Sequence, residues 1–432
     1  MENKRTINDL HQLQALPLEV KIKKTKQRLR EWVDEYGLDG VYVSFSGGKD
    51  STVLLTIVRE MYGDDAKGVF VDTGLEYPEI RQFVKTFPNI DWIKPKMNFK
   101  QVIEKYGYPF ISKEVAECVY GARKYLTSVL AQMDDLDRQT DRQTDRQTDR
   151  LPYSYRFERL CGYGEFEKTN RGGIKTSIGE SGELEHTPVS ERLTKALTQD
   201  CGKAIDNLRI QRLMGILTMH GKATMEDIPS VKDRSMFSCV RWQFFLDAPF
   251  EIANQCCNVM KKAPGRIYQK KTGRVPMTAQ MASESRLRTQ VWLRNGCNAF
   301  DAKKPISNPM AFWTEQDVLL YIYMNKIPIC SVYGDIVREE DFQGQLNWAD
   351  MGLFDLDRPT LKTTGCNRTG CVFCGFGCHL EKPGQGRFER LKITHPKLYD
   401  YLMRPKEQGG LNYKEIIDWI NENNGKGTII RY

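Results

Sequence analysis

The sequence lacks long apolar runs. No stretch of its 432 residues approaches the roughly 18 uninterrupted apolar residues that a membrane-spanning helix needs. The first residues, Met1 to Arg5, are polar and do not form the apolar core of a secretory signal. These absences predict a cytoplasmic protein that has no membrane partner.

A large excess of charge is also lacking, since the formal net charge is only +8 at pH 7. The positive residues are nevertheless concentrated in residues 261–294, where nine of them are opposed by Glu284 alone. They are Lys261, Lys262, Arg266, Lys270, Lys271, Arg274, Arg286, Arg288 and Arg294. This pattern favours a polyanionic partner, a nucleotide or a nucleic acid, over the alternative of a solvated basic face.

Apolar residues are missing from residues 137–150, where Asp-Arg-Gln-Thr occurs three times and is followed by Asp-Arg. A segment without apolar residues cannot bury a face, so we expect a solvated helix or a disordered linker. It lies in an insertion, residues 126–235, to which the sequence assigns no role.

Around this insertion, strand-like and helix-like segments alternate with short turns. Residues 41–45, 67–72 and 90–93 are typical of strands, and the segments between them are typical of helices. We therefore predict an α/β fold with a doubly wound, Rossmann-like parallel sheet. The predicted organisation is a basic helix in 1–38, a nucleotide-binding half in 39–125, the insertion, a second half in 236–345, and a Cys-rich segment with C-terminal helices in 346–432.

The turn after the first strand has the residues of an anion-binding site. Ser46, Gly47 and Gly48 separate that strand from a helix that runs onward from Ser51. A glycine turn before a helix leaves backbone N–H groups unpaired, and these groups bind anions together with the helix dipole. Lys49 adds a positive charge, Asp50 a carboxylate, and the two serines add hydroxyl donors. The turn is not a Walker loop, because Asp50 follows Gly48-Lys49 where that loop has Ser or Thr.

The second strand ends at Asp72-Thr73-Gly74, and ligands of such sheets bind at the carboxyl ends of strands. We therefore predict a nucleotide site at this edge. Its predicted residues are Ser44, Ser46, Gly47, Gly48, Lys49, Asp50, Ser51, Asp72, Thr73 and Gly74.

The sequence has 12 cysteines, which is many for a reducing compartment, where clustered cysteines indicate metal more often than disulfides. Cys366, Cys371, Cys374 and Cys378 are close together, and read locally they fit a structural zinc or a 4Fe–4S cluster. The consecutive pair Cys256-Cys257 lies far from them in the sequence and needs its own explanation.

The loop Ser46-Gly-Gly-Lys-Asp-Ser51 resembles the PP-loop of the ATP pyrophosphatase superfamily, whose members cleave ATP between the α and β phosphates. The chain as a whole resembles the phosphoadenosine-phosphosulfate reductase family of that superfamily. The further matches are Asp72-Thr73-Gly74 with Pro78-Glu79, Glu284-Ser285-x-x-Arg288, Asn308-Pro309 with Trp313 and Asp317-Val318, and Gly370-Cys371-x-x-Cys374.

This resemblance implies a cysteine set different from the local one. In iron–sulfur members of the family, a consecutive Cys pair and a later Cys-x-x-Cys hold one 4Fe–4S cluster, and a lysine four residues after the pair lies near cluster and nucleotide. The matching positions are Cys256, Cys257, Cys371, Cys374 and Lys261. We favour this set and keep Cys366 and Cys378 as alternates.

The sequence departs from the sulfonucleotide reductases of the family in three places. No cysteine follows Cys378, whereas those enzymes use a nucleophilic cysteine in a C-terminal tail. Met281 stands where the family has an arginine before its Glu-Ser-x-x-Arg motif. Lys49-Asp50-Ser51 keeps the form found in ATP-cleaving members.

We therefore expect an iron–sulfur PP-loop enzyme that cleaves ATP to pyrophosphate and an adenylate while transferring sulfur to a nucleic acid. Mg²⁺ is expected near Asp50 and Asp72, and Lys49, Lys261, Arg286 and Arg288 are expected to neutralise the departing pyrophosphate. A sulfur- or electron-donor protein would be a second partner. The alternatives are an adenylylsulfate or phosphoadenylylsulfate reductase that uses Cys366 or Cys378, and a non-catalytic nucleotide-binding subunit.

Overall fold

The computed structural model describes residues 5–121, 123–124, 239–338, 360–425 and 427–432, and four two-residue strands between residues 167 and 222. Those strands are β5 (Glu167–Lys168), β6 (Ile174–Lys175), β7 (Leu217–Thr218) and β8 (Gly221–Lys222). The rest of the predicted insertion, including the Asp-Arg-Gln-Thr repeats, lies outside the described residues. The chain forms two compact units, Met1–Phe99 with Cys257–Phe373, and Lys100–Cys256 with Cys374–Tyr432, and each is described by itself.

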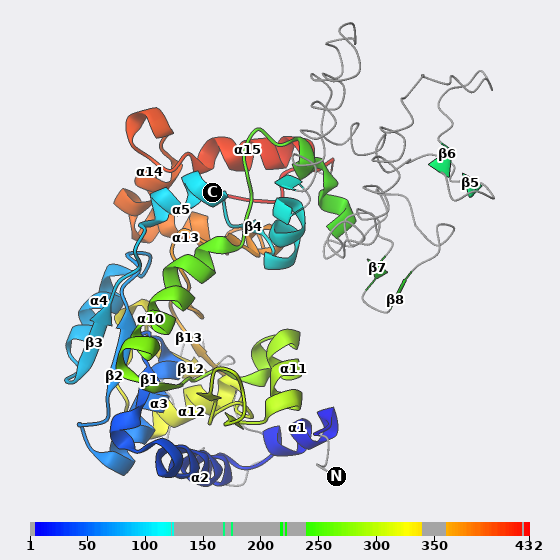
Figure 1. The fold of residues 1–432 in the computed structure, drawn as a ribbon. Helices are drawn as coiled ribbons and strands as arrows, with labels where there is room; N and C mark the ends of the chain where they lie inside the picture. The colour runs from blue at the N-terminus through cyan, green and yellow to red at the C-terminus, as the bar shows by residue number, and fades with distance from the viewer. Residues whose placement is uncertain are drawn as a thin grey trace, which may run out of the picture. The chain divides into compact units, whose positions relative to one another are not determined.

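The first unit is built on a six-stranded sheet in the order β10-β11-β9-β1-β2-β3. Its strands are β1 (Val41–Ser44), β2 (Gly68–Val71), β3 (Ile90–Ile93), β9 (Val275–Met277), β10 (Asn298–Ala299) and β11 (Ile306–Ser307). All neighbours pair in parallel except β10 and β11 at one edge. The predicted α/β fold is confirmed, with an antiparallel edge pair added to the parallel sheet. Figure 1 shows β1, β2 and β3 side by side.

Helices and short turns surround this sheet. They are α1 (Ile7–Gln14), α2 (Leu18–Tyr36), η1 (Leu38–Gly40), α3 (Lys49–Tyr62), α4 (Pro78–Lys85), η6 (Cys257–Lys262), α10 (Ala263–Thr272), η7 (Ala282–Glu284), α11 (Arg286–Asn295), α12 (Glu315–Met324) and η8 (Ser331–Tyr333). A separate two-stranded sheet joins β12 (Ile336–Arg338) to β13 (Leu361–Thr363).

Both faces of the central sheet are covered, as its buried strands require. Tyr42 of β1 packs against Tyr268 of α10 with ring centroids 5.2 Å apart. Its neighbours Val41 and Val43 point to the opposite face because side chains alternate along a strand, and both are almost fully buried. Helix α3 packs on β1 and is covered in turn by α2 and α12.

Helix α12 begins with a capping box. Thr314 accepts a hydrogen bond from the backbone N–H of Asp317, and the Asp317 carboxylate accepts one from the N–H of Thr314 at 2.7 Å. Asp317 also pairs with Lys21 of α2 at 2.6 Å, and both side chains are buried. The box therefore fixes the start of α12 and, through Lys21, its position against α2.

The second unit gathers helices around an aromatic core. Its elements are most of α5 (Phe99–Tyr106), β4 (Phe110–Ile111), η5 (Cys239–Asp247), β14 (Gly375–Phe376), η10 (Cys378–Leu380), α13 (Arg387–Thr394), α14 (Pro396–Met403), η11 (Lys406–Gln408) and α15 (Tyr413–Asn423). Strand β14 pairs in parallel with β4, and Tyr413 packs against Tyr108, Phe110 and Phe388. Gly375 is required there, because a Cβ would lie 2.6 Å from the Phe110 ring.

The segment that begins at the second cysteine of the pair is not a regular α-helix. Residues Cys257–Lys262 form a π-helical turn, η6, before α10 begins at Ala263. Such turns are rare and are often found at functional sites. Among the described residues, none of the helices is both long enough and apolar enough to cross a membrane.

Candidate functional site

The loop between β1 and α3 is closed by its own hydroxyl groups. Ser51 Oγ accepts a hydrogen bond from the backbone N–H of Ser46 at 3.1 Å and lies 3.0 Å from Ser46 Oγ. Ser46 Oγ in turn accepts a hydrogen bond from the N–H of Gly48 at 3.3 Å. The two serines thus hold the loop in shape and keep their hydroxyls beside the first turn of α3.

The two glycines of the loop lie where a side chain would meet close neighbours, and Gly47 is the more restricted of the two. Gly47 has φ +70°, and a Cβ there would lie 2.8 Å from a Val84 methyl and 3.0 Å from an Ile80 methyl. Gly48 precedes α3, and a Cβ there would lie 3.2 to 3.6 Å from the hydroxyl oxygens of Ser46, Tyr333 and Thr369. The loop therefore packs closely against α4 on one side and presents bare backbone to three hydroxyl groups on the other.

Lys49 opens α3 and is buried, with only 3% of its surface exposed. Its ammonium lies 2.9 Å from the Glu315 carboxylate at the start of α12 and donates to the backbone carbonyl of Asn367 at 2.8 Å. Its backbone N–H donates to the Tyr333 hydroxyl at 3.2 Å. The predicted phosphate-binding lysine therefore already has a carboxylate counterion.

Asp50 and Asp72 each have one buried carboxylate oxygen without a hydrogen-bond partner among the described residues. Burial raises the pKa of Asp50, although the Lys49 charge opposes this effect. The other oxygen of Asp72 accepts a hydrogen bond from Arg81 at 2.9 Å. Buried carboxylate oxygens without donors suit a hard cation such as Mg²⁺.

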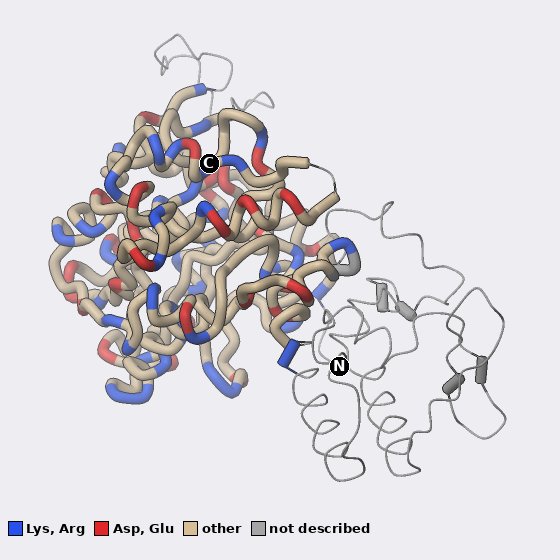
Figure 2. Tube along the Cα trace, turned by 90° about the horizontal axis from the view of Figure 1, so that it is seen from above, with Lys and Arg blue, Asp and Glu red and all other residues tan. Residues whose placement is uncertain are grey.

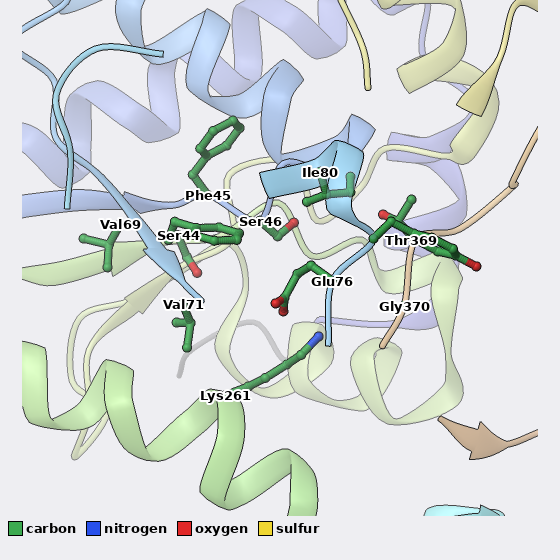
Figure 3. A pocket seen from close by; sticks show the side chains of 12 residues that line it. Ser44, Phe45, Ser46, Val69, Val71, Glu76, Ile80, Lys261, Thr369 and Gly370 are labelled. Atoms are coloured by element: carbon green, nitrogen blue, oxygen red, sulfur yellow. The ribbon is translucent and has the colours of Figure 1, made fainter. Parts of the chain in front are cut away.

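A cavity of about 150 Å³ opens at the carboxyl ends of β1 and β2. Among the predicted site residues, Ser44, Ser46 and Lys261 line it. Its other lining residues are Phe45, Val69, Phe70, Val71, Glu76, Tyr77, Ile80, Thr369 and Gly370. Figure 3 shows Lys261 reaching from the π-helical turn toward Glu76. The cavity occupies the place where parallel α/β sheets bind ligands.

The predicted turn Asp72-Thr73-Gly74 reaches this cavity through Glu76. The Glu76 carboxylate accepts hydrogen bonds from the Thr73 hydroxyl at 2.6 Å and from the Thr73 N–H at 3.1 Å. Gly74 supplies the turn with φ +73°. Thr73 therefore orients an acidic side chain in the cavity wall.

Lys261 connects the cavity to two of the cysteines. The Lys261 side chain is exposed as a whole. Desolvation of its ammonium group alone would lower the pKa of Lys261, but Cys371, Glu76 and Cys257 outweigh this effect and raise it. Cys371 also forms a hydrogen bond with the Lys261 side chain. The structure thus brings together Lys261, Cys257 and Cys371, three of the residues that the family resemblance singles out.

The other two cysteines of that set belong to the second unit. Burial raises the pKa of Tyr413, and among its neighbours Cys374 and Cys256 add most to this shift. All four cysteines are thiols rather than members of disulfides. Within the part of the chain that the structure describes, no three His, Cys, Asp or Glu side chains are arranged to hold a metal ion.

The alternates Cys366 and Cys378 are buried, at 6% and 2% exposure. The Cys378 thiol donates to the Gly375 carbonyl at 2.7 Å, and burial raises its pKa well above the usual range. Cys378 is thus a protonated core thiol with low reactivity.

Arg286 and Arg288 both lie in the first turn of α11. Ser285 caps this helix by accepting a hydrogen bond from the N–H of Arg288, which explains the serine of the Glu-Ser-x-x-Arg motif. The Arg288 side chain pairs with Glu284. Burial and Arg368 lower the pKa of Arg288, whereas Asp50 raises it, so these three charges act on one another.

The basic stretch 261–294 does not form one uniform surface. Arg274 donates to the Asp39 carbonyl at 2.8 Å, and Arg266 donates to Asn258 at 2.8 Å. The exposed basic side chains in the stretch are those of Lys261, Lys262, Lys270, Lys271, Arg286 and Arg294. Figure 2 shows positive and negative residues interspersed along the described chain.

Comparison with known proteins identifies the family. The family model for the phosphoadenosine phosphosulfate reductase domain matches residues 40–119 and 226–375, which is more than half of the chain. The chain belongs to this family. Within the match lie the Ser46–Ser51 loop, Lys261 and the four cysteines Cys256, Cys257, Cys371 and Cys374.

Two relatives from Methanocaldococcus jannaschii are similar to part of the chain. The uncharacterized protein MJ0973 is 40% identical over 74 residues, and these cover 16% of this chain and 18% of that protein. The uncharacterized protein MJ0066 is 40% identical over 73 residues, covering 16% of this chain and 15% of that protein. The matched part is therefore less than a fifth of either relative.

Several residues of the site in this family member were not found from sequence. Glu315, Tyr333 and Thr369 come from segments roughly 270 to 320 residues after Lys49 and contact the loop only in the folded unit. Glu76 had a local signal, since it follows the predicted Asp72-Thr73-Gly74 turn. Arg368 precedes the Gly370-Cys371 motif by two residues, so its proximity to that motif was a second usable signal.

Proposed function

We propose that the chain binds ATP with its phosphates over the Ser46–Ser51 loop and cleaves it between the α and β phosphates. The observation that carries this proposal is the cavity at the carboxyl ends of β1 and β2, bordered by Ser46 on one side and Lys261 on another. In this role Lys261 and Arg288 neutralise charge on the departing pyrophosphate, and Lys49 exchanges Glu315 for phosphate oxygens.

Asp50 and Asp72 are the proposed carboxylates for Mg²⁺, which when bound would screen the phosphate charge. Their buried oxygens without hydrogen-bond partners among the described residues support this assignment. One or two carboxylates are the usual protein contribution to a Mg²⁺–nucleotide site, because the phosphates supply the other ligands.

We further propose that ATP cleavage serves sulfur transfer to a nucleic acid, with Cys256, Cys257, Cys371 and Cys374 holding a 4Fe–4S cluster. The family resemblance supports this assignment, and within the first unit Cys257 and Cys371 both interact with Lys261. Such a cluster would present or activate sulfur delivered by a donor protein. The exposed basic residues of 261–294 are the proposed contacts for the acceptor.

Metal content tests the cysteine assignment. Protein purified without oxygen is expected to contain about four irons and four acid-labile sulfides per chain, with broad absorption at about 400 nm. Cys256→Ser should lose this iron, whereas Cys366→Ser should keep it. One zinc and no sulfide would instead give the cysteines a structural role.

Pyrophosphate release tests the reaction. ATP with Mg²⁺, a nucleic acid and a sulfide source should yield pyrophosphate, and Asp50→Asn should abolish this yield while the fold is retained. ATP binding without turnover under all of these conditions would point to a nucleotide-binding subunit. Sulfite release from adenylylsulfate or its 3′-phosphorylated form would point to a reductase, which the burial of Cys366 and Cys378 disfavours.

A further inference from the structure

The cavity beside the loop carries a hydroxyl group whose role the sequence motifs do not assign. Thr369 lines the cavity together with Ser46 and Lys261, and all three residues belong to the first unit. Figure 3 shows Thr369 and Lys261 as separate parts of the cavity wall. Thr369 is thus a neutral hydrogen-bond donor at a site whose other prominent donor is a cation.

A chain of hydrogen bonds leads from the loop to Thr369. The backbone N–H of Lys49 donates to the Tyr333 hydroxyl at 3.2 Å, and that hydroxyl lies 2.7 Å from Thr369 Oγ1. Because Tyr333 accepts from Lys49, its own proton is available for Thr369, and Thr369 can then turn its proton into the cavity. An anion in the cavity favours this arrangement of protons. In the alternative arrangement Thr369 would donate to Tyr333 and would point its oxygen lone pairs at the anion.

Tyr333 is suited to hold this arrangement. Its side chain is only 2% exposed, and the Lys49 ammonium lies 5.7 Å from its ring centroid. Burial raises the pKa of Tyr333 to about 12, so the phenol keeps its proton at neutral pH. Three hydroxyl oxygens, those of Ser46, Tyr333 and Thr369, also converge within 3.6 Å of the place that a Gly48 Cβ would fill.

We propose that Thr369 donates its hydroxyl proton to a phosphate group of the nucleotide in this cavity, and that Tyr333 is the positioning residue that orients Thr369. This inference rests on the proposed function, because it assigns the cavity to a nucleoside triphosphate. Thr369 would thus add a neutral donor to Lys261 and the loop. A directional hydrogen bond would then orient the phosphate that the positive charges attract.

The test compares ATP with adenosine, which has the same base and sugar but no phosphate. Thr369→Val should raise the Kd for ATP about 10- to 100-fold, the loss expected for one hydrogen bond to a charged group, and leave the Kd for adenosine unchanged. Thr369→Ser, which keeps the hydroxyl, should bind ATP as the parent protein does. Titration calorimetry measures each Kd.

Tyr333→Phe tests the positioning role. The variant should weaken ATP binding in the same selective way, and the double variant Tyr333→Phe with Thr369→Val should bind no more weakly than Thr369→Val alone. Thermal unfolding shows whether each variant is folded. If Tyr333→Phe does not fold, the comparison of Thr369→Val with Thr369→Ser decides the matter.

The outcomes separate this inference from the proposed function. ATP binding by the parent protein with an unchanged Kd in Thr369→Val would overturn the inference and leave the function standing. Equal weakening of ATP and adenosine would also overturn it, because Thr369 would then only shape the cavity. A parent protein that does not bind ATP overturns both.

Discussion

Lys49 and Lys261 are two cations of the same unit, and they differ in the atoms that surround the ammonium group. Lys49 is buried and held by oxygen, at 2.9 Å from Glu315 and 2.8 Å from the Asn367 carbonyl. Lys261 lines the cavity between Glu76 and the thiols of Cys371 and Cys257. One lysine is already neutralised by its counterion, and the other connects the proposed nucleotide cavity to the cysteines.

This difference shows that the lysine within a recognisable motif need not be the most accessible charge of a site. Lys49 can reach a phosphate only if it leaves Glu315. The loss of the Lys49–Glu315 ion pair reduces the binding free energy that Lys49 contributes. Lys261 can act on a ligand without leaving the cavity wall. We therefore expect substitutions at Lys261 to cost more catalysis than changes to the Lys49 ion pair.

Among the tests of this comparison between the two lysines, the largest expected effect is that of Lys261→Met. Removing a preorganised cation beside developing negative charge should lower the rate of pyrophosphate release about 100-fold, in the range found for the loss of one electrostatic donor. Single-turnover kinetics with labelled ATP measures this rate.

Lys262→Met is the matched control, because Lys262 is the next residue of the same π-helical turn and its side chain is exposed. Because Lys262 also belongs to the proposed acceptor-binding stretch, the rate is measured with saturating nucleic acid, and under this condition Lys262→Met should release pyrophosphate at the parent rate. A similar loss in both variants would mean that the turn, rather than the Lys261 charge, is what the reaction needs.

The comparison also shows what could be predicted from sequence. The loop around Lys49 was predictable because the strand, the two glycines and the helix are contiguous, and Gly47 with φ +70° behaves as its position demands. The fold class followed from the same alternation of segments. The antiparallel pair β10–β11 was missed, since strands of two residues carry no readable periodicity.

The environment of Lys261 was not predictable from local pattern. Its place near the cysteines came from the family resemblance, and the π-helical turn that presents it depends on packing within the folded unit. Glu315 and Asn367 were missed as partners of Lys49 because they approach it only in the folded unit. The predicted boundaries of the insertion and the predicted metal ligands remain predictions.

A smaller and opposite effect is expected for Glu315→Gln. The substitution removes the carboxylate that competes with phosphate for Lys49, so ATP should bind more tightly, by about 5-fold. This corresponds to roughly 1 kcal/mol, the upper end for a pair whose acid is partly exposed. Titration calorimetry measures the change.

Glu35→Gln, an exposed position at the end of α2, removes the same charge from the same unit and is the control. Its Kd for ATP should stay at the parent value. Weaker ATP binding in Glu315→Gln would mean that Glu315 holds Lys49 in its productive position instead of competing for it.

The smallest expected effect is on stability, at Asp50, the neighbour of Lys49 in the chain. Burial raises the pKa of Asp50 above its ordinary value of 3.8, so the folded state binds this proton more tightly than the unfolded state does. The free energy of unfolding therefore falls as the pH rises through the window between 3.8 and the raised pKa. At neutral pH the ionised carboxylate costs stability, so Asp50→Asn should raise the free energy of unfolding by about 0.5 kcal/mol, the lower end for a single stabilising substitution, while abolishing turnover. Urea unfolding at pH 8 should show this gain, which should shrink as the pH approaches 4.

The control is Asp65→Asn, an exposed position, which should show neither the gain nor its pH dependence. A loss of stability in Asp50→Asn would mean that the Lys49 charge, rather than burial, dominates at Asp50.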